Sequence, residues 1–542
     1  MKQLFIESTC YMAAKKRVLI IGLDGFTWRL GRGFMAEGAM PRLAALVEAG
    51  CHGDLKSVMP FETSPAWSSF QTGCRPGKTS VFAFHRYDRA TGQVGLNSFA
   101  DNAMPSLWEL ASRAGKKVVS LNMPLSWPPP KVNGVIIPGL LCPNLSAQSV
   151  HPPQAYDKYI APHKDYKAVN YNYRNTVRQF ADQSIATEKL RCRVALELMN
   201  DVDWDIFCVQ MQSVDLMQHR CWWALDPTAA GFDADRNKEA LAFYRYCDEA
   251  IGRIVDAAGK DSLVFIVSDH GFCKARGWVS INTWLKQNEY LHLVPPKPES
   301  LWLATKRKVP PLKWLARLYG YTARRLKGEK NKPIFAVTDL KHMRQVIDFE
   351  KTKVICVGGM GGLIYIDGPI EERKELTKKL TSRIMRDLGP DSKAPAIETI
   401  TSGTEVYGAE NPPDLLPDLV VEYKHGFEAI RSPGCLTITG PKQVDGRDTG
   451  THDRNGVLVV HGPGVKTKAE LDGSIIDITP TVLAYLSIAV PRHIDGKVLD
   501  GAFTEPIKVN YEDMAIDRTG GVQYTDAEQI EIEKRLMDMG YL

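Results

Sequence analysis

Six side chains of the kinds that bind metal ions stand at or beside the ends of predicted strands. They are Asp24, Asp215, His219, Asp269, His270 and His452. Three carboxylates and three imidazoles form a ligand set that suits a pair of divalent metal ions, and mixed oxygen and nitrogen ligation favours zinc. The same ligands also suit manganese or iron.

The strands before these residues explain why they should meet. Apolar runs end in LIIGLDG, FCVQMQ and FIVSDHG, and binding sites in open α/β sheets form at the carboxyl ends of strands. Asp215 and His219 stand four residues apart, so one helical turn would direct both side chains the same way. His452, in GTHDRNG, comes before the strand GVLVV, so we expect it to reach the site from a loop.

The segment FETSPAWSSFQTG (61–73) predicts a helix that begins near Thr63. The Thr63 hydroxyl has two interpretations, a helix cap or a nucleophile. Two metal ions roughly 4 Å apart can activate a hydroxyl group and stabilise a leaving oxygen. A helix N-terminus also offers backbone N–H groups to a phosphoryl group. Thr63 is therefore a candidate nucleophile.

Buried strands alternating with helical segments predict an α/β fold. Helical patterns at 41–50 and 239–259 separate apolar, β-branched runs that are typical of a central, largely parallel sheet covered by helices on both faces. The predicted strands are 17–25, 116–124, 204–212, 263–271, 418–423 and 456–464.

Length and composition narrow the class of protein. A chain of 542 residues predicts one large domain with insertions, or two domains. A net charge of +5 over this length does not indicate nucleic-acid binding, and the apolar runs are strand-sized, too short to span a membrane. Eleven scattered cysteines without a CxxC pair indicate reduced thiols, so we expect a cytoplasmic protein.

A segment at 296–335 is rich in Lys and Arg interleaved with Trp, Leu and Tyr. One interpretation is a solvated amphipathic helix within an insertion. The other is a cap that attracts phosphate-bearing substrates, or a patch at 304–332 that rests on anionic lipid. Near the C-terminus, Thr525 and Glu528 form a capping box that predicts a helix packed on the main domain.

These features divide the chain into five parts. We expect an N-terminal extension (1–16), the first part of the catalytic core (17–285), a basic insertion or cap (286–345), the second part of the core (346–510) and a helical tail (511–542).

The ordered motifs resemble the alkaline phosphatase superfamily, and within it the type I phosphodiesterase/nucleotide pyrophosphatase branch with its predicted phosphohydrolases and phosphomutases. The resemblance covers about residues 17 to 510. The motifs that carry it are LIIGLDG, TSPAWSSFQTGCRPGKTSVFAF, SVDLMQH, VSDHG and GTHDRNG.

The resemblance implies a role for each site residue. One zinc ion would be held by Asp24, Thr63, Asp269 and His270, and the other by Asp215, His219 and His452. Thr63 would attack phosphorus and form a phosphothreonine that water then hydrolyses. This implies a phosphohydrolase or phosphodiesterase that acts on a small phosphate ester, with no specific nucleic-acid partner.

The chain departs from the branch at one position. Nucleotide pyrophosphatases carry an Asn three residues after the nucleophile, where this chain has Ala66. Stabilisation of the phosphoryl oxygens must then come from elsewhere, for example from backbone N–H groups near Ser64. Arg75 and Lys78 are either phosphate contacts or surface charges.

Four other classes of protein make different demands on the sequence. Sulfatases need a Cys or Ser where this chain has Thr63, and cofactor-independent phosphomutases use a Ser and a separate domain larger than the insertion at 286–345. A nucleotide pyrophosphatase is the third. A membrane-associated module without activity would lack metal ligands, and here none of the six is missing.

Trp222 and Trp223 either line a leaving-group pocket or, as we expect, pack beneath the metal site.

Overall fold

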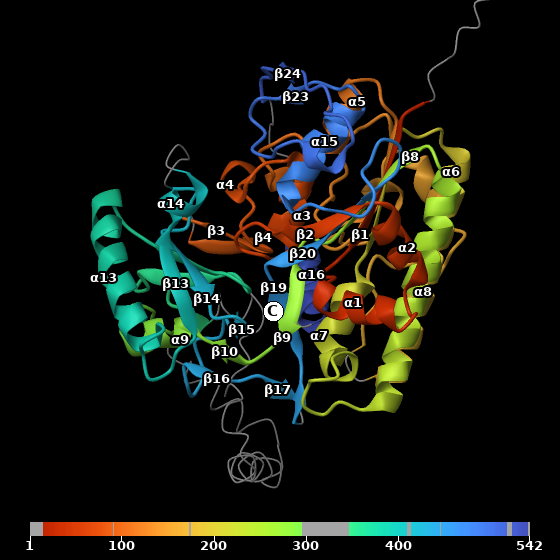
Figure 1. Ribbon diagram of the computed structural model, residues 1–542. Helices are drawn as coiled ribbons and strands as arrows, with labels where there is room; N and C mark the ends of the chain where they lie inside the picture. The colour runs from red at the N-terminus through yellow and green to blue at the C-terminus, as the bar shows by residue number, and fades with distance from the viewer. Residues whose placement is uncertain are drawn as a thin grey trace, which may run out of the picture.

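A mostly parallel sheet runs through the middle of the computed structural model (Figure 1). Its strands follow the order β21-β2-β20-β8-β1-β7-β5-β6, and β22 also pairs with β2. Within the described part of the sheet, β20 alone runs against its neighbours, β2 and β8. The strands are β1 (Arg17–Leu23), β2 (Cys51–Lys56), β5 (Val118–Met123), β6 (Gly134–Pro138), β7 (Ile206–Met211), β8 (Ser262–Val267), β20 (Asn455–His461), β21 (Ala469–Glu470) and β22 (Gly473–Ser474).

Alternate residues of β1 enter two different cores, because successive side chains of a strand point to opposite faces of a sheet. Leu19 and Ile21 pack with one set of helices, whereas Val18 and Ile20 pack with the other. The first face is covered by α1 (Trp28–Ala36), α2 (Pro41–Ala49), α6 (Val177–Asp201), α7 (Ser213–Leu225), α8 (Ala234–Ala258) and α16 (Asp526–Met539). The second is covered by α3 (Thr63–Thr72), α5 (Leu107–Arg113) and α15 (Ile478–Tyr485). The predicted α/β fold, with helices on both faces of a mostly parallel sheet, is confirmed.

A second, antiparallel sheet forms its own core beside the first (Figure 1). It contains β11 (Val354–Val357), β12 (Gly362–Ile366), β14 (Leu419–Tyr423) and β13 (Ile397–Ser402), in that order, and packs with α9 (Ile281–Gln287) and α13 (Ile370–Leu388). The interpretation of 418–423 as a strand of the central sheet is therefore wrong. An apolar run indicates that a strand is buried, but it does not indicate which sheet the strand belongs to.

Several pairs of short strands lie outside the two larger sheets. The pairs are β9 (Gly271–Lys274) with β19 (Gly450–Asp453), β3 (His85–Asp88) with β4 (Gln93–Leu96), β17 (Gln443–Val444) with β18 (Arg447–Asp448), and β23 (Val490–Pro491) with β24 (Tyr511–Glu512). A three-stranded sheet joins β10 (Gly277–Val279) to β15 (Phe427–Ala429) and β16 (Thr439–Pro441), and the short helices are α4 (Pro76–Thr79) and α14 (Gly403–Tyr407).

The structure describes residues 15–89, 92–172, 175–294, 346–408, 414–444, 446–516 and 523–539. Residues 295–345 of the predicted basic cap therefore lie outside the described residues. This stretch includes the segment 304–332, for which a membrane contact is one interpretation. Within the described ranges no helix has the length and apolar composition needed to cross a membrane. The ten described cysteines are all free and buried. The predicted capping box is present, since Thr525 Oγ1 accepts a hydrogen bond from the Glu528 backbone N–H at the start of α16.

Candidate active site

The ends of four strands bring the predicted site residues to one edge of the central sheet. β1 pairs in parallel with β7 and β8, so the residues that follow these strands emerge side by side. Asp24 follows β1, Asp215 lies in the first turn of α7, and Asp269 follows β8. β20 runs in the opposite direction, so the chain before it reaches the same edge and brings His452 there. The expectation of a loop was wrong for His452, which lies within β19, paired with Phe272.

The first cluster consists of Asp24, Asp269 and His270. All three side chains are buried, and one ligand atom from each lies within 4.8 Å of the others. His270 Nε2 is 3.3 Å from Asp269 Oδ2 and 3.8 Å from Asp24 Oδ1. This is one of the two ligand groups that the family resemblance implied.

The second cluster consists of Asp215, His219 and His452. α7 places Asp215 and His219 one turn apart, and Oδ1 of Asp215 is 3.5 Å from His219 Nε2 and 3.3 Å from His452 Nε2. The two clusters adjoin, because the rings of His270 and His452 stack with their centroids 3.7 Å apart. The structure therefore brings all six predicted Asp and His residues together in two groups of three.

Backbone carbonyls orient all three imidazoles in the same way. The Nδ1 atoms of His219, His270 and His452 lie 3.1–3.2 Å from the carbonyl oxygens of Gly450, Gly271 and Phe61. A carbonyl only accepts, so each ring carries its proton on Nδ1 and directs Nε2 into the site. Metal-bound histidines are oriented by this kind of outer hydrogen bond.

The buried carboxyl groups and imidazole nitrogens of the two clusters favour the binding of cations. His219 Nε2 and His452 Nε2 are 3.1 Å apart, so two imidazole nitrogens share one space beside a carboxylate. Burial, together with the charges of Asp269 and Asp215, raises the pKa of Asp24 well above its usual value, and burial raises the pKa of Asp269 to about 8. Buried oxygens of both carboxyl groups, Asp24 Oδ1 and Asp269 Oδ2, receive no hydrogen bond from the described residues. Divalent ions would replace these protons and satisfy the oxygens, so the residues present fit a metal pair.

Thr63 is the first residue of α3, and Glu62 is the N-cap, whose side chain makes no capping hydrogen bond. The idea that Thr63 also caps the helix is therefore wrong. Its buried hydroxyl lies 3.5 Å from Nε2 of His270, next to the first cluster. The backbone N–H groups of Thr63 and Ser64 belong to the first turn, which has no carbonyl partners within the helix. A nucleophile and two phosphoryl-binding donors could therefore act from the same helix end.

The sequence model of the type I phosphodiesterase/nucleotide pyrophosphatase family matches residues 18–355. The chain belongs to this family. Membership confirms the predicted resemblance and the predicted enzyme class, a phosphoric ester hydrolase that acts on a small-molecule ester. Hydrolases of this superfamily depend on metal ions, and the two clusters are candidate ligand groups for them.

Solved structures of phosphonoacetate hydrolase share the fold at low sequence identity. Phosphonoacetate hydrolase from Sinorhizobium meliloti 1021 in complex with phosphonoformate has a TM-score of 0.54 at 13% identity, over 87% of this chain and 96% of the other. Human ectonucleotide pyrophosphatase/phosphodiesterase 5 has a TM-score of 0.48 at 12% identity, over 90% of this chain and 100% of the other. No curated protein matches the sequence.

Two residues that support the first cluster were not predicted. Trp67 Nε1 and Gln210 Nε2 donate hydrogen bonds to Oδ2 of Asp24, at 2.8 and 2.7 Å. Gln210 could have been noticed, because it is an amide within the otherwise apolar strand β7. Trp67 had no such signal, since a tryptophan in a buried helix is ordinary core packing.

A buried ion pair on α6 contacts the N-terminal end of α7, the helix that carries two residues of the second cluster. Glu188 and Arg191 lie one turn apart on α6 with their charged groups 2.5 Å apart. Oε1 of Glu188 also accepts a hydrogen bond of 3.3 Å from the backbone N–H of Ser213, the first residue of α7. The pair thereby anchors the helix end that carries Asp215.

The structure distinguishes between the two interpretations of Arg75 and Lys78, as phosphate contacts or as surface charges. Lys78 Nζ contacts Asp495 Oδ1 at 2.5 Å and the His493 carbonyl at 2.8 Å, and Arg75 is exposed. Both basic residues follow the C-terminal end of α3, the end opposite Thr63, and α3 itself is about 14 Å long at 1.5 Å of rise per residue. They are structural or surface charges in this structure. Ala66 is fully buried and has no group that could replace the expected amide.

Trp222 packs beneath the metal-ligand clusters, as the sequence predicts, whereas the buried ring of Trp223 contacts the Arg447 guanidinium at 4.3 Å from its centroid. Trp222 is fully buried and stacks on Phe272, with ring centroids 6.2 Å apart. The ring of Phe272 in turn meets the His219 ring edge-on at 4.7 Å. These aromatic groups therefore support the histidines from the core side.

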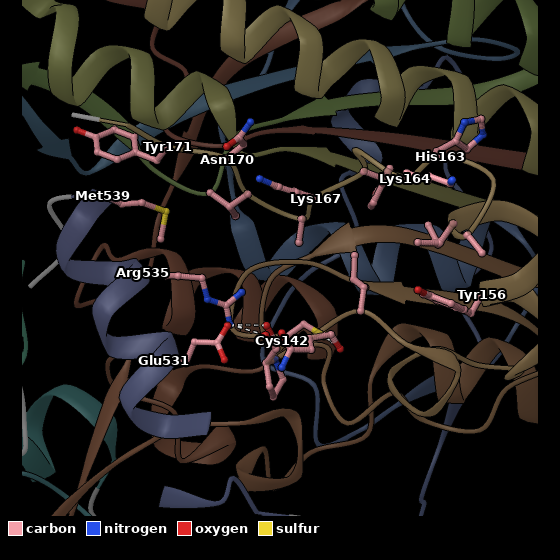
Figure 2. Close-up of a pocket in the computed structure, with 18 residues that line it drawn as sticks. Cys142, Tyr156, His163, Lys164, Lys167, Asn170, Tyr171, Glu531, Arg535 and Met539 are labelled. Carbon is pink, nitrogen blue, oxygen red and sulfur yellow. Dashed lines mark hydrogen bonds between the residues drawn. The ribbon is translucent and has the colours of Figure 1, made fainter. Parts of the chain in front are cut away.

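A cavity of about 670 Å³ lies away from this chemistry, between α16 and the segment that follows β6 (Figure 2). Tyr156, Lys167 and Arg535 are among its lining residues. None of the predicted site residues lines it. Its size alone therefore gives no reason to place the catalytic site there.

Proposed function

We propose that this protein hydrolyses phosphoric esters with Thr63 as the nucleophile, assisted by two divalent metal ions that are bound by the two clusters. The observation that carries the proposal is the position of the Thr63 hydroxyl, 3.5 Å from His270 Nε2 and at the N-terminus of α3. A hydroxyl with only a capping role would instead accept from the backbone of its own helix.

The ligand chemistry supports zinc. Asp24, Asp269 and His270, with the Thr63 oxygen, would hold one ion; Asp215, His219 and His452 would hold the other. Mixed carboxylate and imidazole ligation without sulfur is typical of catalytic zinc sites and also suits manganese. When bound, the ions supply positive charge that lowers the pKa of a hydroxyl and stabilises a leaving oxygen.

The chain's own groups define the two steps. The Thr63 hydroxyl loses its proton to solvent, its oxygen forms a bond to phosphorus, and the bond between phosphorus and the alcohol oxygen breaks. The departing alcohol takes up a proton from water. Water then attacks the phosphothreonine, which releases the phosphoryl group and restores the hydroxyl. The N–H groups of Thr63 and Ser64 bind the phosphoryl oxygens in both steps, a role for which Ala66 offers no side chain.

The experiment compares the wild-type protein with Thr63→Ala on bis-p-nitrophenyl phosphate and p-nitrophenyl phosphate, with added zinc or manganese and after chelation. Loss of the nucleophile should lower kcat by at least about 10³-fold. Thr63→Ser keeps a hydroxyl and should retain measurable turnover. Thr72→Ala is the matched control, because Thr72 is equally buried at the other end of α3.

The outcomes are distinct. Metal-dependent turnover that is lost in Thr63→Ala but kept in Thr72→Ala supports the proposal, and the ratio between the two substrates separates diester from monoester preference. Turnover that survives Thr63→Ala refutes the assignment of the nucleophile.

A further inference from the structure

The ribbon formed by β9 and β19 has two chemically different faces. His452 pairs with Phe272, and Thr451 pairs with Cys273. Side chains alternate along each strand, so His452 and Phe272 share the face that carries the second cluster. Cys273 and Asp453 therefore lie on the opposite face, directly behind a residue of the active site.

A turn from the second core reaches this outer face. It follows β14 and presents His425, whose Nε2 lies 3.1 Å from Asp453 Oδ2. Gly426 has a φ of +82°, and a Cβ there would lie 2.7 Å from the Lys274 carbonyl oxygen. The Gly426 carbonyl accepts a hydrogen bond of 2.7 Å from the Arg276 N–H. The turn is thus held closely against the end of β9, and His425 is brought to the ribbon by backbone contacts of its own.

The three side chains form a ligand group of their own. One ligand atom from each of Cys273, His425 and Asp453 lies within 4.8 Å of the others. Cys273 is buried beneath the group, with its sulfur 3.8 Å from the His452 carbonyl, whereas the His425 side chain is 50% exposed. The group therefore has a buried sulfur ligand and an entry from solvent.

We propose that Cys273, His425 and Asp453 bind a further divalent transition-metal ion of the zinc type. Sulfur, imidazole and carboxylate together select such an ion over magnesium or calcium. Metal bonds of 2.0 to 2.3 Å place tetrahedral donors about 3.5 Å apart, so the group needs to close by only about 1 Å. The exposed His425 side chain can supply that movement. On binding, the thiol releases its proton to solvent and a metal–sulfur bond forms.

This outer ion would connect the two cores of the protein. β19 carries His452 on its inner face, and the turn with His425 belongs to the second core. An ion held by both would restrain the strand that positions His452. The outer site does not depend on the chemistry of Thr63, so a test that refutes the proposed function does not refute the outer site, and the reverse also holds.

The test uses the full-length protein loaded with cobalt(II) in place of its native metal. Sulfur-to-cobalt charge transfer absorbs in the near ultraviolet only when a thiolate binds the ion. The two inner clusters contain no cysteine, so among the ligand groups of the described residues this absorption reports the outer site. We expect it in the wild-type protein and expect its loss in Cys273→Ser and in His425→Gln, with one equivalent less metal by elemental analysis. His425→Gln changes a half-exposed side chain, so it tests the site without disturbing the core.

Cys435→Ser and His461→Gln are the matched controls. Cys435 is buried and lies in none of the ligand groups found among the described residues, and His461 is partly exposed at the opposite end of β20. Both should keep the absorption and the full metal content. Cobalt-loaded wild-type protein without sulfur-to-cobalt absorption would overturn the proposal. Absorption that survives Cys273→Ser would also overturn it, because another cysteine would then be the ligand.

Discussion

Trp67 Nε1 donates a hydrogen bond of 2.8 Å to Oδ2 of Asp24 and thereby links the helix that carries Thr63 to a candidate metal ligand. Both residues are fully buried. The bond occupies one carboxylate oxygen and leaves Oδ1 directed at His270. The position of the nucleophile and the orientation of the ligand are therefore coupled through one indole N–H.

Trp67→Phe should weaken metal binding more than it weakens the fold. The ring is kept but the hydrogen bond to Asp24 is lost, and loss of such outer support typically costs about 10- to 100-fold in metal affinity. Titration with zinc, followed by calorimetry, measures the effect. Trp108→Phe is the control, because Trp108 is also buried but donates to Gln71. Equal zinc affinity in the two variants would contradict the coupling.

Gly25→Ala should damage the site through contact as well as backbone strain. Gly25 has a φ of +66°, and a Cβ there would lie 2.9 Å from the Phe272 ring and 3.2 Å from Asp215 Oδ1. We expect a loss of about 3 kcal/mol in unfolding free energy, from left-handed strain plus overpacking. Gly38 has a φ of +71° and open space around it, so Gly38→Ala carries only the strain, about 1–2 kcal/mol. Chemical denaturation of both variants checks the difference, and equal losses would remove the contact argument.

Lys78→Met should affect stability and leave substrate binding unchanged. The Lys78 ammonium contacts Asp495, with side chains 28% and 20% exposed, so we expect a cost of about 1 kcal/mol. KM for p-nitrophenyl phosphate should stay within about twofold of wild type, because the lysine follows the far end of α3. Arg75→Met, at an exposed neighbour, serves as the control and should change neither quantity. A KM that rises tenfold or more in Lys78→Met would restore the interpretation as a phosphate contact.

Asp448→Asn should destabilise the protein at neutral pH and less so in acid. Burial opposes the charge of Asp448, but hydrogen bonds from Lys274 and Gln443 outweigh it and lower the pKa below the usual 3.8. A lowered folded-state pKa contributes stability above the unfolded-state value, and this stability is lost as pH falls through the folded-state value. We expect about 1–3 kcal/mol at pH 7, shrinking below about pH 4. Urea unfolding across this range measures it.

Asp235→Asn is the matched control for this pH dependence. The Asp235 side chain is 88% exposed in its pair with Lys238, so the substitution should cost less than about 0.5 kcal/mol at any pH. A constant difference between Asp448→Asn and wild type from neutral to acid pH would contradict the charge argument.

Local pattern was sufficient for the elements and for the residue types at the site. The apolar runs before Asp24, Asp215 and Asp269 predict strands whose carboxyl ends share an edge, and the structure has them there. The four-residue spacing of Asp215 and His219 predicts one helical turn, which α7 provides. Both inferences need only the repeat of a strand or a helix.

The failures occurred where pairing partners are distant in the chain. The sequence predicts that the strand at 418–423 belongs to the central sheet and that His452 lies in a loop, because neither sheet membership nor the β9–β19 pairing leaves a local signal. The N-cap of α3 is Glu62 and not the predicted Thr63, because the position of the cap depends on the backbone angles at the start of the helix.

The kinds of chemistry available follow from the sequence alone, because three carboxylates, three imidazoles and a threonine follow strand and helix periodicities that act over a few residues. Which atoms face one another depends on how the chain folds in three dimensions. The bonds from Trp67 and Gln210 to Asp24 span 43 and 186 residues, and His425 reaches Asp453 from another core. Such contacts depend on sheet register and on the packing of whole layers, which short-range patterns do not encode.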